Sequence, residues 1–196
     1  IPAATRFQVS LPTAVAATSA FIEIDARADV EPAAENALMG EVADLGAAIP
    51  AKELAIQWDV CMEVLSVDTN DQREGLSEWE PPGDPMERYL KVVKLLSSYV
   101  AVDTPMGIHL CYGDLLHRHL VEPKDLENVV RMANASVTQI ARVVDFVHLP
   151  VPRDRSDDDY FAPLADLEIG GAKLYLGLVH HTDGVAGGLN RLKTAK

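Results

Sequence analysis

A regular alternation of short β-rich runs with helical patterns constrains the fold of this chain most strongly. Strands are expected at Arg6 to Leu11, Leu54 to Val60, Met106 to Tyr112, Asp145 to Val151 and Lys173 to Val179. Between them, apolar residues recur every three or four positions, as on one face of a helix. Helices are therefore expected at Pro32 to Ala48, Pro85 to Val102 and Pro123 to Val143, with a last helix that opens near Leu189. Tandem βα units of this kind are typical of α/β proteins with a parallel sheet.

Prolines and polar runs mark where these elements end. Pro12 is expected to stop the first strand, and the first helix is expected to end before Pro50. The stretch from Asn70 to Asp84 carries glycine, two adjacent prolines and several charges, which indicates a loop. The polar run from Pro152 to Tyr160 indicates a second loop, at the carboxyl end of a strand.

Composition limits the classes of function. The chain has 196 residues, 48% of them hydrophobic, so residues 1–196 are expected to form a single domain with a substantial core. A formal net charge of -13 argues against nucleic acid or an anionic membrane surface as partner. Two cysteines 50 positions apart indicate reduced thiols, and no apolar run of about 18 residues predicts a membrane span. A cytoplasmic protein is expected.

One short motif points to a metal. His109 and Cys111 stand two positions apart in an expected strand, and residues i and i+2 of a strand lie on the same face. An imidazole and a thiolate are ligands that suit zinc. The pair is therefore a candidate for part of a zinc site.

Five βα units in tandem predict part of an eight-stranded (β/α)8 barrel, a TIM barrel, whose sites lie at the carboxyl ends of the strands. Polar residues gather at or just after those ends in this chain: Asp59, His109, Cys111, Asp114, His148, His180, His181 and Asp183. This gathering predicts a site at one rim. A histidine near a strand end is nevertheless more often a hydrogen-bonded structural residue than a ligand.

A family resemblance runs through four segments: Phe7 to Thr13, Leu54 to Asp59, Gly107 to Asp114 and Leu174 to His180. They resemble barrel strands of the C-terminal catalytic barrel of the cobalamin-independent methionine synthase family. The likeness is closest to the shorter, single-barrel methionine-synthase-like proteins of the superfamily that includes uroporphyrinogen decarboxylase. The resemblance covers nearly the whole chain, and its His-x-Cys strand is the distinctive part.

The resemblance implies zinc-dependent methyl transfer to a thiol such as homocysteine, as in methionine biosynthesis, with a folate-type methyl donor. It implies that His109 and Cys111 are metal ligands and that Asp59 grips the amino group of the substrate. Asp114, His148, His180 and Asp183 are then candidates for substrate binding. A bound zinc ion lowers the pKa of a thiol, so that the nucleophile forms at neutral pH.

The chain also departs from the family pattern. Pro150 stands where the family has a glutamate ligand, and no cysteine follows His180 to supply the last one. The first strands and the closing strand of the barrel are also not found, so a fragment of a protein of about 350 residues is expected. A missing segment or a second chain would then complete the barrel. Cys61 shares the strand parity of Asp59 and is a substitute ligand.

Two other functions stay open. Pro150 favours a metal-free decarboxylase or lyase of the same superfamily. Alternatively, the polar residues only shape the pocket of a noncatalytic small-molecule-binding barrel. Cys111 itself could be a small buried hydrophobic residue.

Overall fold

The computed structural model describes residue 2 and residues 5–68, 83–114 and 119–196. These residues form an α/β fold around a five-stranded sheet in the order β1-β2-β3-β4-β5. The strands are β1 (Phe7–Pro12), β2 (Leu54–Val60), β3 (Met106–Leu110), β4 (Phe146–Pro150) and β5 (Lys173–Gly177). All four neighbouring pairs are parallel. The predicted α/β class and its parallel sheet are confirmed.

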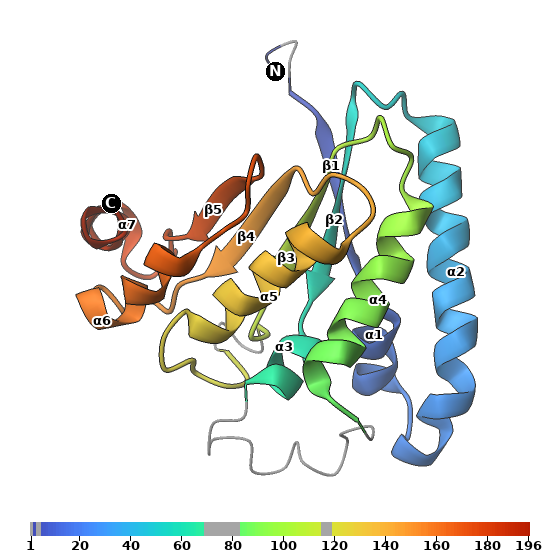
Figure 1. The fold of residues 1–196 in the computed structure, drawn as a ribbon, viewed down its shortest axis with the longest axis horizontal. Coiled ribbons are helices and arrows are strands. Elements are labelled where there is room, and N and C mark those ends of the chain that lie inside the picture. Colours follow the sequence, from blue (N-terminus) through green and yellow to red (C-terminus); the bar gives the residue numbers. More distant parts are fainter. Residues whose placement is uncertain (1, 3–4, 69–82, 115–118) are drawn as a thin grey trace.

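Helical segments connect consecutive strands, as parallel pairing requires. They are α1 (Ala14–Phe21), η1 (Ile24–Ala26), α2 (Arg27–Ala48), α3 (Met62–Val67), α4 (Pro85–Tyr99), α5 (Glu127–Gln139), α6 (Asp158–Phe161), η3 (Ala162–Asp166) and α7 (Gly184–Thr194). Figure 1 shows α2, α4 and α5 on one side of the sheet and α7 beyond the end of β5. In the described part of the chain, β1 pairs only with β2, and β5 pairs only with β4. This order of strands is that of part of a barrel, but closure into a barrel is not seen.

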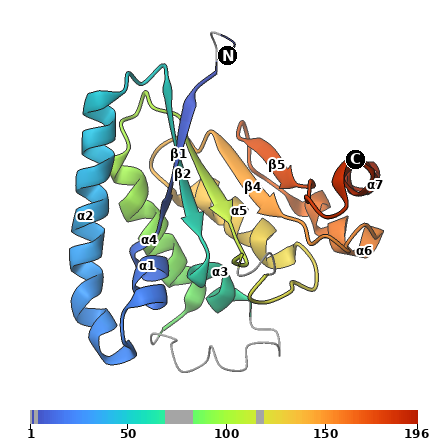
Figure 2. The same ribbon diagram turned by 180° about the vertical axis from the view of Figure 1, so that it is seen from behind.

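The two faces of the sheet differ in chemistry. Ile56, Trp58 and Ile108 point to the helical side and are each 1% exposed. They belong to one core cluster with the inward faces of α4 and α5. The residues that alternate with them, such as Asp59 and His109, point to the opposite side, and Figure 2 shows this side of the sheet in front of α4 and α5. The helices thus bury one face, and the polar residues of the strands lie on the other.

Helix α4 shows why its sequence predicts a helix so clearly. Asp84 accepts hydrogen bonds from the backbone N–H groups of Met86 and Glu87 and so caps the first turn, while Pro85 occupies the first helical position. The buried residues follow at helical spacing: Tyr89, Leu90, Val93, Leu96 and Ser97. Pattern and cap therefore agree on where this helix begins.

Several predicted boundaries differ from the structure. Pro12 is the last residue of β1 rather than its stop, because an edge strand tolerates a residue without an N–H group. Helix α2 begins at Arg27, five residues before Pro32, and the Arg27 side chain bonds to Ser19 O and Ile22 O. These contacts with α1 hold a first turn that periodicity does not reveal.

Short helices account for most of the remaining differences. The prediction missed α1 and α3, and α6 begins inside the stretch from Pro152 to Tyr160 that was expected to be a loop. Helix α5 is shorter than the predicted Pro123 to Val143, and α7 starts earlier than Leu189. The expected loop from Asn70 to Asp84 lies outside the described residues except at its end. None of the helices in the described ranges has the length and apolar composition needed to cross a bilayer.

Gly107 in β3 allows close packing on the polar face of the sheet. A Cβ atom at this position would lie 2.1 Å from Cε2 of Phe146, whose ring also packs edge-on against Tyr175 at 5.9 Å. We expect Gly107→Ala to lower the free energy of unfolding by about 1–3 kcal/mol, because the Phe146 ring must move. Denaturant unfolding measures this change. The double variant with Phe146→Ala should show no further loss from the added methyl group; an additive loss would contradict the clash.

Candidate functional site

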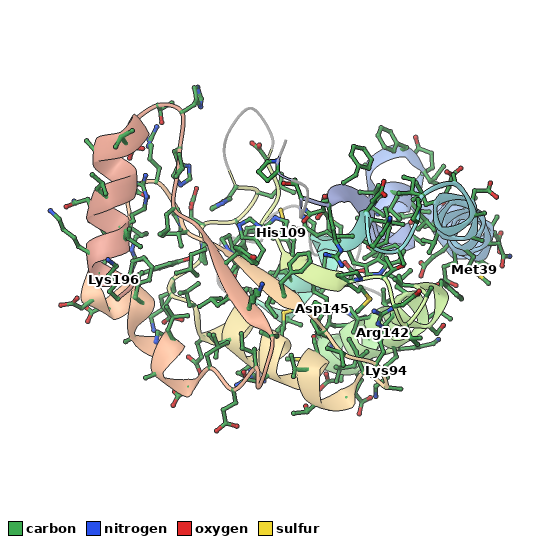
Figure 3. All side chains as sticks on the ribbon, turned by 90° about the horizontal axis from the view of Figure 1, so that it is seen from above. Met39, Lys94, His109, Arg142, Asp145 and Lys196 are labelled. Atoms are coloured by element: carbon green, nitrogen blue, oxygen red, sulfur yellow. The ribbon has the colours of Figure 1, made fainter. Side chains whose placement is uncertain are left out.

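A row of polar side chains crosses three neighbouring strands at their carboxyl ends. Asp59 of β2 pairs in register with His109 of β3, and His109 pairs with His148 of β4. Residues in register on parallel strands point to the same face, so the three side chains are neighbours. All three are half-buried. In Figure 3, His109 lies on the side of the sheet away from α4 and α5.

The neighbours of His109 fix its ring. The His109 and His148 rings stack with centroids 4.4 Å apart, and His109 Nδ1 lies 3.3 Å from the carbonyl oxygen of His148. A carbonyl oxygen only accepts hydrogen bonds, so Nδ1 carries the proton in this contact and Nε2 is left for another partner. This is the tautomer that a histidine needs to bind a metal or a thiol through Nε2.

The pKa values of the two histidines are shifted in opposite directions. Burial lowers the pKa of His109, but its interactions with Cys111 and Asp59 outweigh burial and raise the pKa above its ordinary value. Burial and the neighbouring His109 lower the pKa of His148 to about 4. His148 is therefore neutral at pH 7 and stacks on His109 without charge repulsion.

Two thiols meet at the ends of β2 and β3. Cys61 follows the last residue of β2, and Cys111 follows β3, where its N–H donates to Val60 O at 2.8 Å. The backbone N–H of Gly113 donates to Cys111 Sγ at 3.2 Å, in a turn where Gly113 has a φ of 83°. Cys61 occupies the N-cap position of α3 just beyond β2, and from there its side chain interacts with Cys111.

The two thiols shift each other's pKa in opposite directions. The interaction with the Cys61 thiol lowers the pKa of Cys111 to about 4, helped by His109 and by the N–H of Gly113, although burial acts in the opposite direction. The interaction with Cys111 and burial raise the pKa of Cys61 far above its ordinary value. These shifts favour the thiolate form at Cys111 and the thiol form at Cys61.

Asp59 belongs to a hydrogen-bonded amide network that the sequence does not reveal. Gln57 Nε2 donates to Asp59 Oδ1 at 2.8 Å and to Ser10 Oγ at 3.2 Å, and Gln8 donates to Gln57 Oε1 at 3.1 Å. Burial raises the pKa of Asp59 despite the hydrogen bond from Gln57. The alternation along β2 could have indicated this network. Gln57 alternates with the buried Ile56 and Trp58, so its side chain points to the same face as that of Asp59.

The other predicted site residues lie in different surroundings. His180 Nε2 bonds to Val151 O at 2.9 Å, and both carboxylate oxygens of Asp183 accept from the buried Arg191, at 2.7 and 2.9 Å. Asp114 is exposed. Within the described ranges, no hydrogen bond joins His180 or Asp183 to the cluster around His109. A role of Asp114, His180 and Asp183 in substrate binding stays a prediction. The observed contacts of His180 and Asp183 stabilise α7 and the loop that precedes it.

The donor set around His109 suits a soft divalent metal in its chemistry. One imidazole and two thiols are the ligands that zinc takes in proteins. Across the described residues, however, no three His, Cys, Asp or Glu side chains are arranged closely enough to form a complete metal site. The cluster therefore offers part of a ligand set.

Comparison of the chain with protein-family models, with curated proteins and with solved structures gives no match. The resemblance to methionine synthases therefore rests only on the sequence segments named above. A function for this chain has to be proposed from the geometry of the candidate site.

Proposed function

We propose that this protein is a zinc-dependent methyltransferase acting on a small-molecule thiol, such as homocysteine, within an α/β barrel. The observation that supports it best is the meeting of Cys61, His109 and Cys111 at adjacent strand ends, where barrel enzymes place their sites. In this proposal the three side chains supply part of the ligand set of the metal, and a folate-type molecule donates the methyl group.

Each residue has a defined task in this proposal. The carbonyl oxygen of His148 accepts from His109 Nδ1–H and leaves Nε2 as the ring atom that would face a metal. The lowered pKa of Cys111 favours the thiolate form that a metal ligand needs. Bound zinc would supply the lowered pKa of the substrate thiol. Asp59, oriented by Gln57, offers a carboxylate to the substrate ammonium.

Pro150 is the observation that favours the second candidate. Its side chain has no donor atom, and its carbonyl oxygen is bonded to the Tyr160 hydroxyl at 2.9 Å. The position where the family has a glutamate ligand therefore contributes no side-chain ligand. A metal-free decarboxylase or lyase would instead use the Cys111 thiolate with His109 as a proton-transfer pair. In a noncatalytic binding barrel, neither Cys111 nor His109 would take part in a reaction.

The edges of the sheet bear on the proposed partners. Phe7 on β1 is 63% exposed and Tyr175 on β5 is 51% exposed. Open edges of parallel strands are normally paired or covered. The barrel in this proposal is completed by strands of another segment or of a second chain placed against β1 and β5.

Zinc binding tests the proposal directly. The full chain, equilibrated with zinc at neutral pH, is expected to bind about one ion, because Cys61, His109 and Cys111 lie at adjacent strand ends and supply part of a zinc ligand set. His109→Ala and Cys111→Ala should each weaken binding by about 100-fold, since each removes a ligand. Competition with a chromophoric chelator measures the affinity.

His181→Ala is the matched control, because His181 is an exposed histidine outside the cluster. It should bind zinc as the unaltered chain does. If the unaltered chain binds no zinc, the metal-dependent function is wrong. A ligand screen by thermal shift, followed by turnover assays on any hit, would then separate the metal-free enzyme from the binding protein.

A further inference from the structure

A separate cavity of about 200 Å³ lies among the helices α1, α2, α3 and α4. Its lining is mixed: Val15, Glu31, Glu35, Glu63, Ser66, Pro85, Arg88, Lys91, Val92 and Leu95. None of the residues of the candidate site around His109 lines it. In Figure 1, the four helices gather beside the carboxyl ends of β1 and β2.

Glu63 is the unusual member of this lining. The residue is 5% exposed, and neither carboxylate oxygen has a hydrogen-bond partner among the residues that the structure describes. The Thr13 hydroxyl is close enough to lower the pKa of this carboxyl, but burial outweighs it and raises the pKa to about 7. A buried carboxylate without a partner costs free energy, and a positively charged donor in the cavity would remove that cost.

The rest of the lining indicates what kind of cation fits. Glu31 already has a charged neighbour in Lys91, whereas Glu63 has none of opposite charge among the groups that act on it. Val15, Val92 and Leu95 supply apolar wall. A hard metal ion needs several oxygen ligands together, and the described residues offer no such group. A charged head on a short aliphatic body matches a buried carboxylate in a cavity that also has an apolar wall.

We propose that this cavity binds a small aliphatic ammonium ion, with the ammonium group against Glu63 and the carbon chain against Val15, Val92 and Leu95. The size agrees, because a cavity of about 150 Å³ is enough for a benzene molecule. Three N–H donors of a primary ammonium can satisfy both carboxylate oxygens of Glu63. The proposal does not depend on the function proposed for the strand ends.

Calorimetry on the full chain tests this with n-butylammonium as the probe. 1-Butanol and butyrate are the comparison ligands, since they keep the carbon chain and change the charge. Butylammonium is expected to bind at least 10-fold more tightly than either. Equal binding of butanol and butylammonium, or no binding of butylammonium at about 50 mM, would overturn the proposal.

Two variants and a control locate the binding. Glu63→Gln should weaken butylammonium binding at least 10-fold, and Val92→Phe should do the same by filling the cavity while leaving the carboxylate in place. Glu41→Gln, an exposed glutamate of α2 outside the cavity, should bind as the unaltered chain does. Circular dichroism confirms that each variant is folded. Unchanged binding in both folded cavity variants would place the ligand elsewhere and overturn the proposal.

Discussion

Cys111 is expected to react with iodoacetamide at a rate that changes little between about pH 8 and pH 5. A thiol with an ordinary pKa loses about 10-fold of its thiolate, and of its rate, for each unit of pH below that pKa. The pKa of Cys111 is lowered to about 4, so its thiolate persists through this range. At pH 5 its rate should exceed that of an ordinary thiol by about 10- to 50-fold, after allowance for the weaker nucleophilicity of a low-pKa thiolate. Mass spectrometry of the labelled peptide measures the rate.

Cys61 provides the internal comparison for this experiment. Its pKa is raised by the interaction with Cys111 and by burial, so it should remain a thiol and label slowly at every pH tested. Cys61→Ala should return the pKa of Cys111 toward its ordinary value, because the interaction that lowers it most is lost. If both cysteines label with the steep pH dependence of free thiols, the polarised pair does not exist in solution.

Trp58→Ala is expected to lower the free energy of unfolding by about 3–5 kcal/mol. Trp58 is 1% exposed and belongs to the core between β2 and the helices, so its removal leaves a large cavity. The loss should appear as a lower midpoint of denaturant unfolding, followed by circular dichroism, with an unchanged slope.

Trp58→Phe separates the ring from its N–H group. The indole Nε1 is buried and has no hydrogen-bond partner in the described part of the chain, so phenylalanine keeps much of the packing and removes an unsatisfied donor. We expect a loss of less than about 1.5 kcal/mol for this variant. A loss as large as that of Trp58→Ala would show that the indole makes a contact that packing alone does not explain.

The candidate site and the core depend on the same strands. Trp58 and Ile108 turn inward to the helices, and this orientation obliges Asp59 and His109 to point the other way. A slip of one residue in register would bury the polar row and expose the core. The apolar face therefore fixes the position of the polar side chains, and stability and site geometry are set by one alternation.

Local pattern predicts much of this arrangement. The five strands occur near their predicted ranges, because short β-rich runs and helical stripes differ in period. The i, i+2 spacing of His109 and Cys111 predicts that they share a face, and their interaction in the structure agrees with it. The sequence does not predict α1 or α3, which are too short for a clear period.

The sequence by itself determined the strands, the longer helices and the face on which His109, Cys111 and Asp59 lie, because these follow from periodicity within one segment. Only the tertiary structure decided that His148 stacks on His109, that Arg191 holds Asp183, and that Glu63 faces a cavity. Each of these contacts joins side chains whose distance depends on how separate strands and helices pack, and no spacing along the chain encodes that distance.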